Sequence, residues 1–172
     1  MSETGVTVRE ALDAMVSAGR FLEWPRLDAQ RALDMVLPYA ECEVFTNASP
    51  AQNYGVRGIV CAVVGDCYQS LKDFERAAGW YLRARGYMRA GGGAPFFAPF
   101  YATAVIDGRL MGHATLAAEC LRDHRAAWRA KPLLTRLYWE VVSLWWLKPS
   151  QWRMRLRELR LLGQLEALAR ER

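Results

Sequence analysis

Apolar and small residues recur at spacings of three and four along most of the chain. This spacing places them on one side of an α-helix, whereas the strict alternation that is typical of half-buried strands is almost absent. Ala, Leu, Arg and Glu are frequent in the same segments, and all four favour helices. The sequence therefore predicts an all-α protein.

The most regular stretch is residues 59–88, where two amphipathic helical patterns are joined by a tight polar turn at Lys72 and Asp73. Small residues fall where the two helices would cross, and aromatic residues fall along the seam between them. The small residues are Gly65 and Ala77, and the aromatic residues are Tyr68, Phe74 and Tyr81. This stretch predicts a closely packed helix pair.

Helical patterns also flank this pair. A capping box at Thr7 and Glu10 predicts the start of a first helix, and Pro25 predicts the start of the next one. Residues 43–53 contain Asn, Ser and Pro, so we expect a loop there with the helix resuming near Tyr54, capped by Asn53. After the glycines at 91–93, which we interpret as a flexible connector, another pair is expected from residue 96, with Gly108 in its turn.

The spacing of Val64, Gly65, Tyr68, Phe74, Ala77, Tyr81 and Ala84 resembles that of a tetratricopeptide repeat (TPR). The resemblance covers roughly residues 54–124, and residues 7–40 more loosely, which implies about three antiparallel helix pairs stacked as a short solenoid over residues 1–130. It also implies a partner-binding groove on the first helix of the central pair. The groove positions carried over are Ile59, Ala62, Asp66, Gln69 and Ser70.

Ala62 and Asp66 stand where members of this family that hold a peptide carboxylate need a basic residue and an amide. The groove therefore suits an apolar or basic partner segment better than an acidic terminus. Solvation of an ordinary helix face is the alternative interpretation of Asp66 and Gln69.

Residues 131–172 predict C-terminal helices packed as a cap on the repeats. Five of the seven tryptophans lie in residues 128–152, and the last helix has an apolar stripe at Trp152, Leu156, Leu159, Leu162, Leu165 and Leu168. The same residues could instead form an interface with a partner or a second copy, or dock on an anionic membrane. The interface candidates are Trp145, Trp146, Trp152, Arg153, Arg157 and Arg160.

Charge is unevenly distributed. Residues 1–121 contain 11 Lys and Arg against 13 Asp and Glu, a net charge of −2, whereas residues 122–172 contain 12 against 5, a net charge of +7. The basic C-terminal third can attract acidic proteins, nucleic acid or anionic lipid. The N-terminus has no signal-peptide pattern and no stretch is apolar enough to span a membrane, so we expect a cytoplasmic protein.

Little in the sequence points to catalysis. The two histidines, His113 and His124, lack metal-ligand spacing, and the four cysteines lie in helical surroundings without CxxC pairs, so we expect buried thiols and neither metal nor cofactor. Motifs for hydrolases, zinc proteases and phosphate loops are absent. The sequence favours an adaptor, chaperone or assembly factor for another protein or peptide; a membrane- or nucleic-acid-associated factor and an enzyme accessory subunit are the alternatives.

Overall fold

The computed structural model describes residues 6–22, 28–42, 45–137 and 149–171, with side chains from residue 160 onward in the last range. Residues 133–137 are helical, and the only β contact within these ranges is a parallel bridge between Thr7 and Thr46. The prediction of an all-α protein is confirmed. The named helices are α1 (Val8–Leu22), α2 (Ala29–Ala40), α3 (Pro50–Ser70), α4 (Phe74–Ala90), α5 (Ala98–Asp107), α6 (Met111–Arg129) and α8 (Pro149–Arg170).

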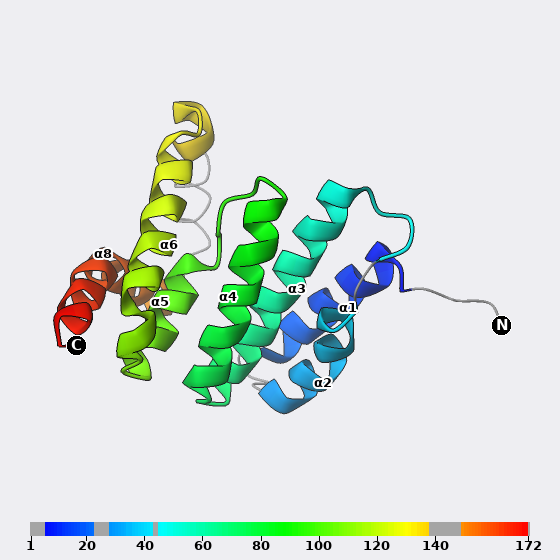
Figure 1. Ribbon diagram of the computed structural model, residues 1–172, viewed down its shortest axis with the longest axis horizontal. Helices are drawn as coiled ribbons and strands as arrows, with labels where there is room; N and C mark the ends of the chain where they lie inside the picture. The colour runs from blue at the N-terminus through cyan, green and yellow to red at the C-terminus, as the bar shows by residue number, and fades with distance from the viewer. Residues whose placement is uncertain (1–5, 23–27, 43–44, 138–148, 172) are drawn as a thin grey trace.

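Helices that follow one another in sequence also lie against each other (Figure 1). α1 packs on α2, α3 on α4 and α5 on α6, and successive pairs meet through α2 with α3 and through α4 with α5. α8 lies at the end of the molecule opposite α1, where it contacts both α5 and α6. The core is therefore built by adding each helix pair to the preceding one.

The first helix begins at the predicted capping box. The backbone N–H of Thr7 donates to Oε2 of Glu10 at 2.7 Å, and the backbone N–H of Glu10 donates to Oγ1 of Thr7 at 3.2 Å. Two amides that would otherwise lack an intrahelical partner are satisfied in this way. This prediction is confirmed.

The start of α3 differs from the prediction. The helix begins at Pro50, four residues before Tyr54, because Ser49 and Gln52 form a second capping box. The backbone N–H of Gln52 donates to Oγ of Ser49 at 3.3 Å, and that of Ser49 donates to Oε1 of Gln52 at 3.0 Å. Pro50 occupies the first helical position, where its missing N–H costs nothing. Asn53, expected as the cap, lies inside the helix and accepts a hydrogen bond from a loop amide instead.

The start of α2 also differs. Pro25, the predicted start, lies outside the described residues, and α2 begins at Ala29. Asp28 is the cap, since its carboxylate accepts from the backbone N–H of Arg31 at 3.1 Å. The carboxylate also lies beside the positive end of the helix dipole, which stabilises this start further.

Three helices end in the same type of hydrogen-bonded turn. A residue with positive φ donates its N–H to the carbonyl three residues before it, and the next N–H reaches the carbonyl five residues before itself. The positive-φ residues are Lys72 (66°), Gly92 (72°) and Arg109 (49°). Gly91, Gly92 and Gly93 therefore end α4 with defined hydrogen bonds, where a flexible connector was predicted.

Gly108 has a different role from the one predicted. Its φ is −84°, which any residue adopts, and the left-handed position belongs to Arg109. A Cβ at Gly108 would lie 2.6 Å from Cβ of Phe74 and 3.0 Å from the carbonyl oxygen of Ala104. Gly108 is needed because the turn packs directly on the first residue of α4.

Aromatic rings join the central pair to the next one. The ring of Tyr81 stacks on that of Phe97 with centroids 5.8 Å apart and 9° between planes, and it lies 5.9 Å from the tilted ring of Tyr101. All three side chains are essentially fully buried. Such pairs stabilise by about 0.5–1.5 kcal/mol beyond the area they bury.

The predicted apolar stripe of α8 is confirmed at Leu165 and Leu168 and differs at Leu161, which is buried in place of Leu162. Leu161, Leu165 and Leu168 are the buried residues of its described part, and Leu162 is only half-buried. The spacing of four and three keeps these residues on one side of the helix, toward α5 and α6. Leu156 and Leu159 lie among the residues whose side chains are not described.

Candidate functional site

The five predicted groove residues lie on one side of α3, which we call the Asp66 face: Ile59, Ala62, Asp66, Gln69 and Ser70. Ala62 is 1% exposed, so it belongs to the core and cannot contact a partner in this conformation. Ile59, Asp66 and Gln69 are half-buried, and Ser70 is exposed. These four residues retain surface, and their role in binding stays a prediction.

Tyr81 of α4 reaches across α3 to this face. Its hydroxyl oxygen lies 2.5 Å from Oδ1 of Asp66 and 2.8 Å from Oε1 of Gln69. The ring passes over Gly65, where an added Cβ would come within 2.7 Å of the ring carbon Cε1. The missing side chain at Gly65 is therefore what allows the ring of Tyr81 to lie against α3.

The three polar groups can satisfy one another in two ways. When Asp66 is ionised, Tyr81 donates its single proton to the carboxylate, and the Gln69 amide can turn its NH₂ group toward the phenol oxygen. When Asp66 is protonated, its hydroxyl can donate to the phenol oxygen, and Tyr81 can donate to Gln69. The cluster thus accommodates a change of protonation without losing its hydrogen bonds.

Burial raises the pKa of Asp66 from 3.8 to about 6, and the hydrogen bond from Tyr81 acts in the opposite direction. Burial and the neighbouring Asp66 charge raise the pKa of Tyr81 well above 10, so the phenol keeps its proton. Across the described part of the chain, no cationic side chain lies within 4 Å of Asp66. Asp66 is therefore a half-buried carboxyl group with a pKa of about 6 and no counter-charge among the described residues.

The following helix pair repeats the geometry of this one. The turn residues Lys72 and Arg109 share the left-handed conformation, so adding 37 to a residue number in α3–α4 gives the equivalent position in α5–α6. Ala77 and its equivalent Ala114 are both fully buried. The two pairs can therefore be compared position by position.

The side of α5 that corresponds to the Asp66 face is less polar. Thr103 takes the place of Asp66, and its hydroxyl donates to the carbonyl oxygen of Pro99 at 2.9 Å within the same helix. Phe96 and Phe100 are 45% and 41% exposed, which is unusual for phenylalanine. This part of the surface offers apolar contact in place of charge.

The Tyr81 hydroxyl is the functional group that sequence reasoning missed. Tyr81 was assigned to the helix seam as a bulky ring, and the sequence does not show from which side of the seam its hydroxyl emerges. The available signal was the combination of Gly65 with a tyrosine sixteen residues later. A ring packed on a glycine can extend past its partner helix and place a polar group on the far side.

No metal centre is present among the described residues, where no three His, Cys, Asp or Glu side chains lie together. His113 is half-buried, and its Nδ1 lies 3.1 Å from the hydroxyl oxygen of Tyr101. Cys61, Cys67 and Cys120 are buried thiols, and burial raises the pKa of Cys67 to about 12. The three thiols are therefore packed within the fold and unreactive in this state.

A cavity of about 280 Å³ lies between α4, α6 and the glycine turn, and Arg85, Arg89 and Asp123 are among its lining residues. The amides of Gly92 and Gly93 are occupied by the carbonyls that end α4. Arg85 is paired with Glu119 at 3.4 Å. The glycine turn therefore does not offer the open amides that a phosphate-binding loop needs.

Most of the predicted interface tail lies outside the description. Trp145 and Trp146 are among the undescribed residues, and the side chains of Trp152, Arg153 and Arg157 are not described; Arg160 is exposed. In the described ranges, every helix is too short or too polar to cross a bilayer. The membrane, partner and second-copy interpretations of the tail stay predictions.

No family model, curated protein or solved structure matches this chain.

Proposed function

We propose that the chain is a short TPR-like scaffold that binds a segment of a partner protein on the Asp66 face. In this proposal three helix pairs stack as a solenoid and α8 covers the last pair. The order of helix contacts supports it, as do the shared turn geometry and the buried small residues at equivalent positions of the two later pairs.

The observation on which the proposal depends is the state of Asp66. Among the described residues this half-buried carboxylate has no counter-charge, so it loses part of its hydration and gains one hydrogen bond, from Tyr81, in return. A lysine or arginine side chain of a partner would provide the missing charge. The phenol of Tyr81 holds the carboxylate in place before the partner arrives, which reduces the entropy lost on binding.

The surroundings of Asp66 indicate the rest of the partner segment. Ile59 is half-buried on the same face, and exposed rings are offered by Phe96 in the turn before α5 and by Phe100 on α5. We therefore expect a segment with one cationic side chain for Asp66 and apolar side chains beside it. The buried thiols Cys61, Cys67 and Cys120 suit a reducing compartment such as the cytoplasm.

The proposal is tested by affinity capture from native extract with three forms of the chain: wild type, Asp66→Arg and Glu75→Arg. Both substitutions change the charge equally, but Glu75 is exposed on α4, outside the Asp66 face. We expect proteins captured by the wild type to be retained by Glu75→Arg and lost with Asp66→Arg. Equal retention by both variants would show that the Asp66 face does not bind the partner.

Folding of the two variants is checked by circular dichroism and thermal unfolding. Loss of capture by Asp66→Arg is attributed to the lost contact at the Asp66 face only where the helical signal of the variant matches that of the wild type. Asp66→Asn is the second form to use if Asp66→Arg unfolds, because the amide oxygen can still accept the hydrogen bond from Tyr81.

A further inference from the structure

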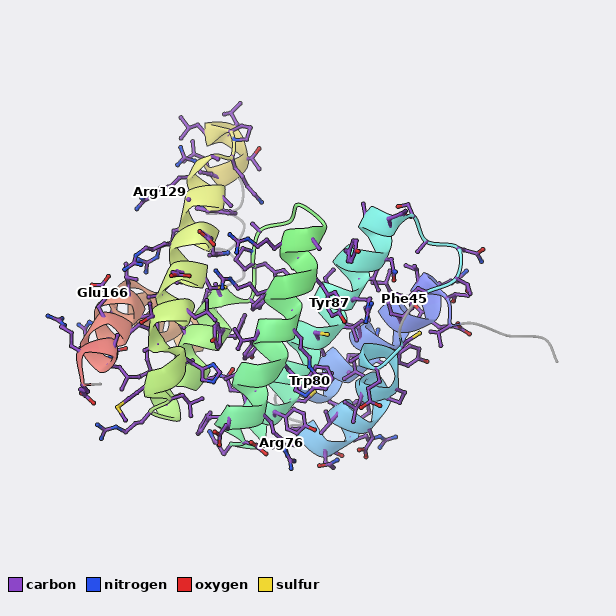
Figure 2. The ribbon with its side chains drawn as sticks, viewed as in Figure 1. Phe45, Arg76, Trp80, Tyr87, Arg129 and Glu166 are labelled. Carbon is purple, nitrogen blue, oxygen red and sulfur yellow. The ribbon has the colours of Figure 1, made fainter. Side chains whose placement is uncertain are left out.

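The opposite side of α3 and α4 has contacts that the proposed function does not use. Arg57 lies nine residues before Asp66, which is two and a half turns and therefore the other side of α3. On α4, Arg76, Trp80, Arg83 and Tyr87 follow at spacings of four, three and four, so they share one side of that helix. Figure 2 shows Arg76, Trp80 and Tyr87 along the side of α4 that is away from α6.

The three arginines on this side of α3 and α4, which are Arg57, Arg76 and Arg83, each lie over an aromatic ring. The guanidinium carbon of Arg57 is 4.1 Å from the ring centroid of Tyr87, and that of Arg83 is 4.5 Å from the centroid of Trp80. Arg57 also donates from Nη2 to the hydroxyl of Tyr87. These contacts hold the guanidinium groups in fixed positions, so little side-chain entropy remains to be lost when they bind a ligand.

Arg57 and Arg83 have no counter-charge within the described residues, since no carboxylate oxygen lies within 4 Å of either guanidinium. Arg76 differs, because it pairs with Asp73 at 3.4 Å. The Nε of Arg57 is buried and has no hydrogen-bond partner. The charges of Arg57 and Arg83 are therefore uncompensated among the described residues and favour binding of an external anion, although the buried Nε of Arg57 is not accessible to it.

The positive charges of Arg57 and Arg83 both lie near the seam between α3 and α4. Arg83 and Tyr87 are four residues apart on α4 and therefore adjacent on its surface, and Arg57 covers the ring of Tyr87. Both guanidinium groups lower the pKa of the buried Cys61 thiol, although burial raises it to about 11 overall. Two positive charges thus converge on the seam between α3 and α4.

We propose that Arg57 and Arg83 bind a carboxylate from an acidic segment of a partner protein. A planar carboxylate matches the paired N–H donors along the edge of a guanidinium group. Single-stranded nucleic acid fits less well, because its bases need open aromatic faces and the arginines cover the faces of Trp80 and Tyr87. The site lies across α3 from the Asp66 face and can be tested independently of it.

The test is fluorescence anisotropy of a labelled hexaglutamate peptide titrated with the full chain. Arg83→Gln should weaken binding about tenfold, or about 1.4 kcal/mol, because the variant loses the charge that assists the hydrogen bond to the carboxylate. Arg76→Gln is the matched control on the same side of α4, and its affinity should stay within about twofold of the wild type, since Asp73 already compensates that charge. Arg57→Gln should weaken binding at least as much as Arg83→Gln.

Arg83 is exposed, so its substitution leaves the core unchanged, whereas Arg57→Gln is interpreted only if its unfolding curve matches the wild type. Equal loss with Arg76→Gln and Arg83→Gln would overturn the site in favour of general charge attraction. Absence of saturable binding to hexaglutamate would also overturn it, and so would tighter binding of an oligothymidylate of equal length. Asp66→Asn should leave hexaglutamate affinity unchanged, which separates this site from the proposed function.

Discussion

The α3–α4 and α5–α6 helix pairs share the same turn conformation and differ in the side chains that pack between their two helices. In both pairs the turn has a non-glycine residue in the left-handed conformation and a fully buried alanine on the second helix. In the α3–α4 pair Tyr81 passes over Gly65 and reaches Asp66. In the α5–α6 pair Ala118 is equivalent to Tyr81, Ala102 to Gly65 and Thr103 to Asp66.

The difference shows how one repeat acquires a polar site while its neighbour serves mainly for packing. Gly65 creates the space, Tyr81 fills it, and the phenol then positions the carboxyl group of Asp66, which has no other partner in the described part of the chain. Alanine at both equivalent positions closes the same space with small side chains.

Gly65→Leu should destabilise the fold by at least about 3 kcal/mol, because even a Cβ there would lie 2.7 Å from the ring of Tyr81. Urea unfolding measures the change. The control is Ala102→Leu at the equivalent buried position of the other pair, where Ala118 takes the place of the tyrosine ring, so its cost should be smaller. Equal costs would mean that the tyrosine does not distinguish the pairs.

Gly108→Ala should destabilise the fold by about 2 kcal/mol, since its Cβ would meet Cβ of Phe74 at 2.6 Å and neither atom can rotate away. Its equivalent in the first turn is Leu71, which is 39% exposed, so Leu71→Ala should cost less than about 0.5 kcal/mol. Thermal unfolding distinguishes the two. A harmless Gly108→Ala would contradict the close contact between this turn and α4.

Asp66→Asn should stabilise the protein by about 1–2 kcal/mol at pH 7.5. The pKa of Asp66 is about 6 in the folded protein against an ordinary value of 3.8, so the folded state binds more protons between these pH values. Stability of the wild type should therefore fall as pH rises from about 4 to 6, and this fall should be smaller in the variant. Urea unfolding across that range measures it; parallel pH profiles would contradict the raised pKa.

Lys72→Gly and Arg109→Gly should each stabilise the protein by about 0.5–1 kcal/mol, because a residue with a Cβ is strained at φ of 66° and 49°. Gly92→Ala is the reciprocal control at 72° and should destabilise by a similar amount. Differential scanning calorimetry resolves changes of this size as shifts in Tm. Opposite signs at Lys72 and Arg109 would show that the two turns are not equivalent.

The sequence predicted the helical class, the Lys72–Asp73 turn and the pair of helices around it, because these depend on local periodicity. Two helix starts were misplaced for a local reason as well: Asp28 and the Ser49 capping box were passed over in favour of Pro25 and Asn53. The burial of Ala62 and the reach of Tyr81 could not be predicted. Both depend on how neighbouring helices are rotated about their axes, which the spacing of residues in one helix does not determine.

The most direct test of the account is calorimetric titration of a captured partner with wild type and Asp66→Asn at pH 7.5 and pH 5. We predict that the wild type loses affinity about tenfold at pH 5, because a carboxyl group with a pKa near 6 is then mostly protonated. Asp66→Asn should bind weakly at both pH values although it is at least as stable as the wild type. Wild-type affinity in Asp66→Asn at pH 7.5 would contradict the central claim that Asp66 is the residue that engages the partner.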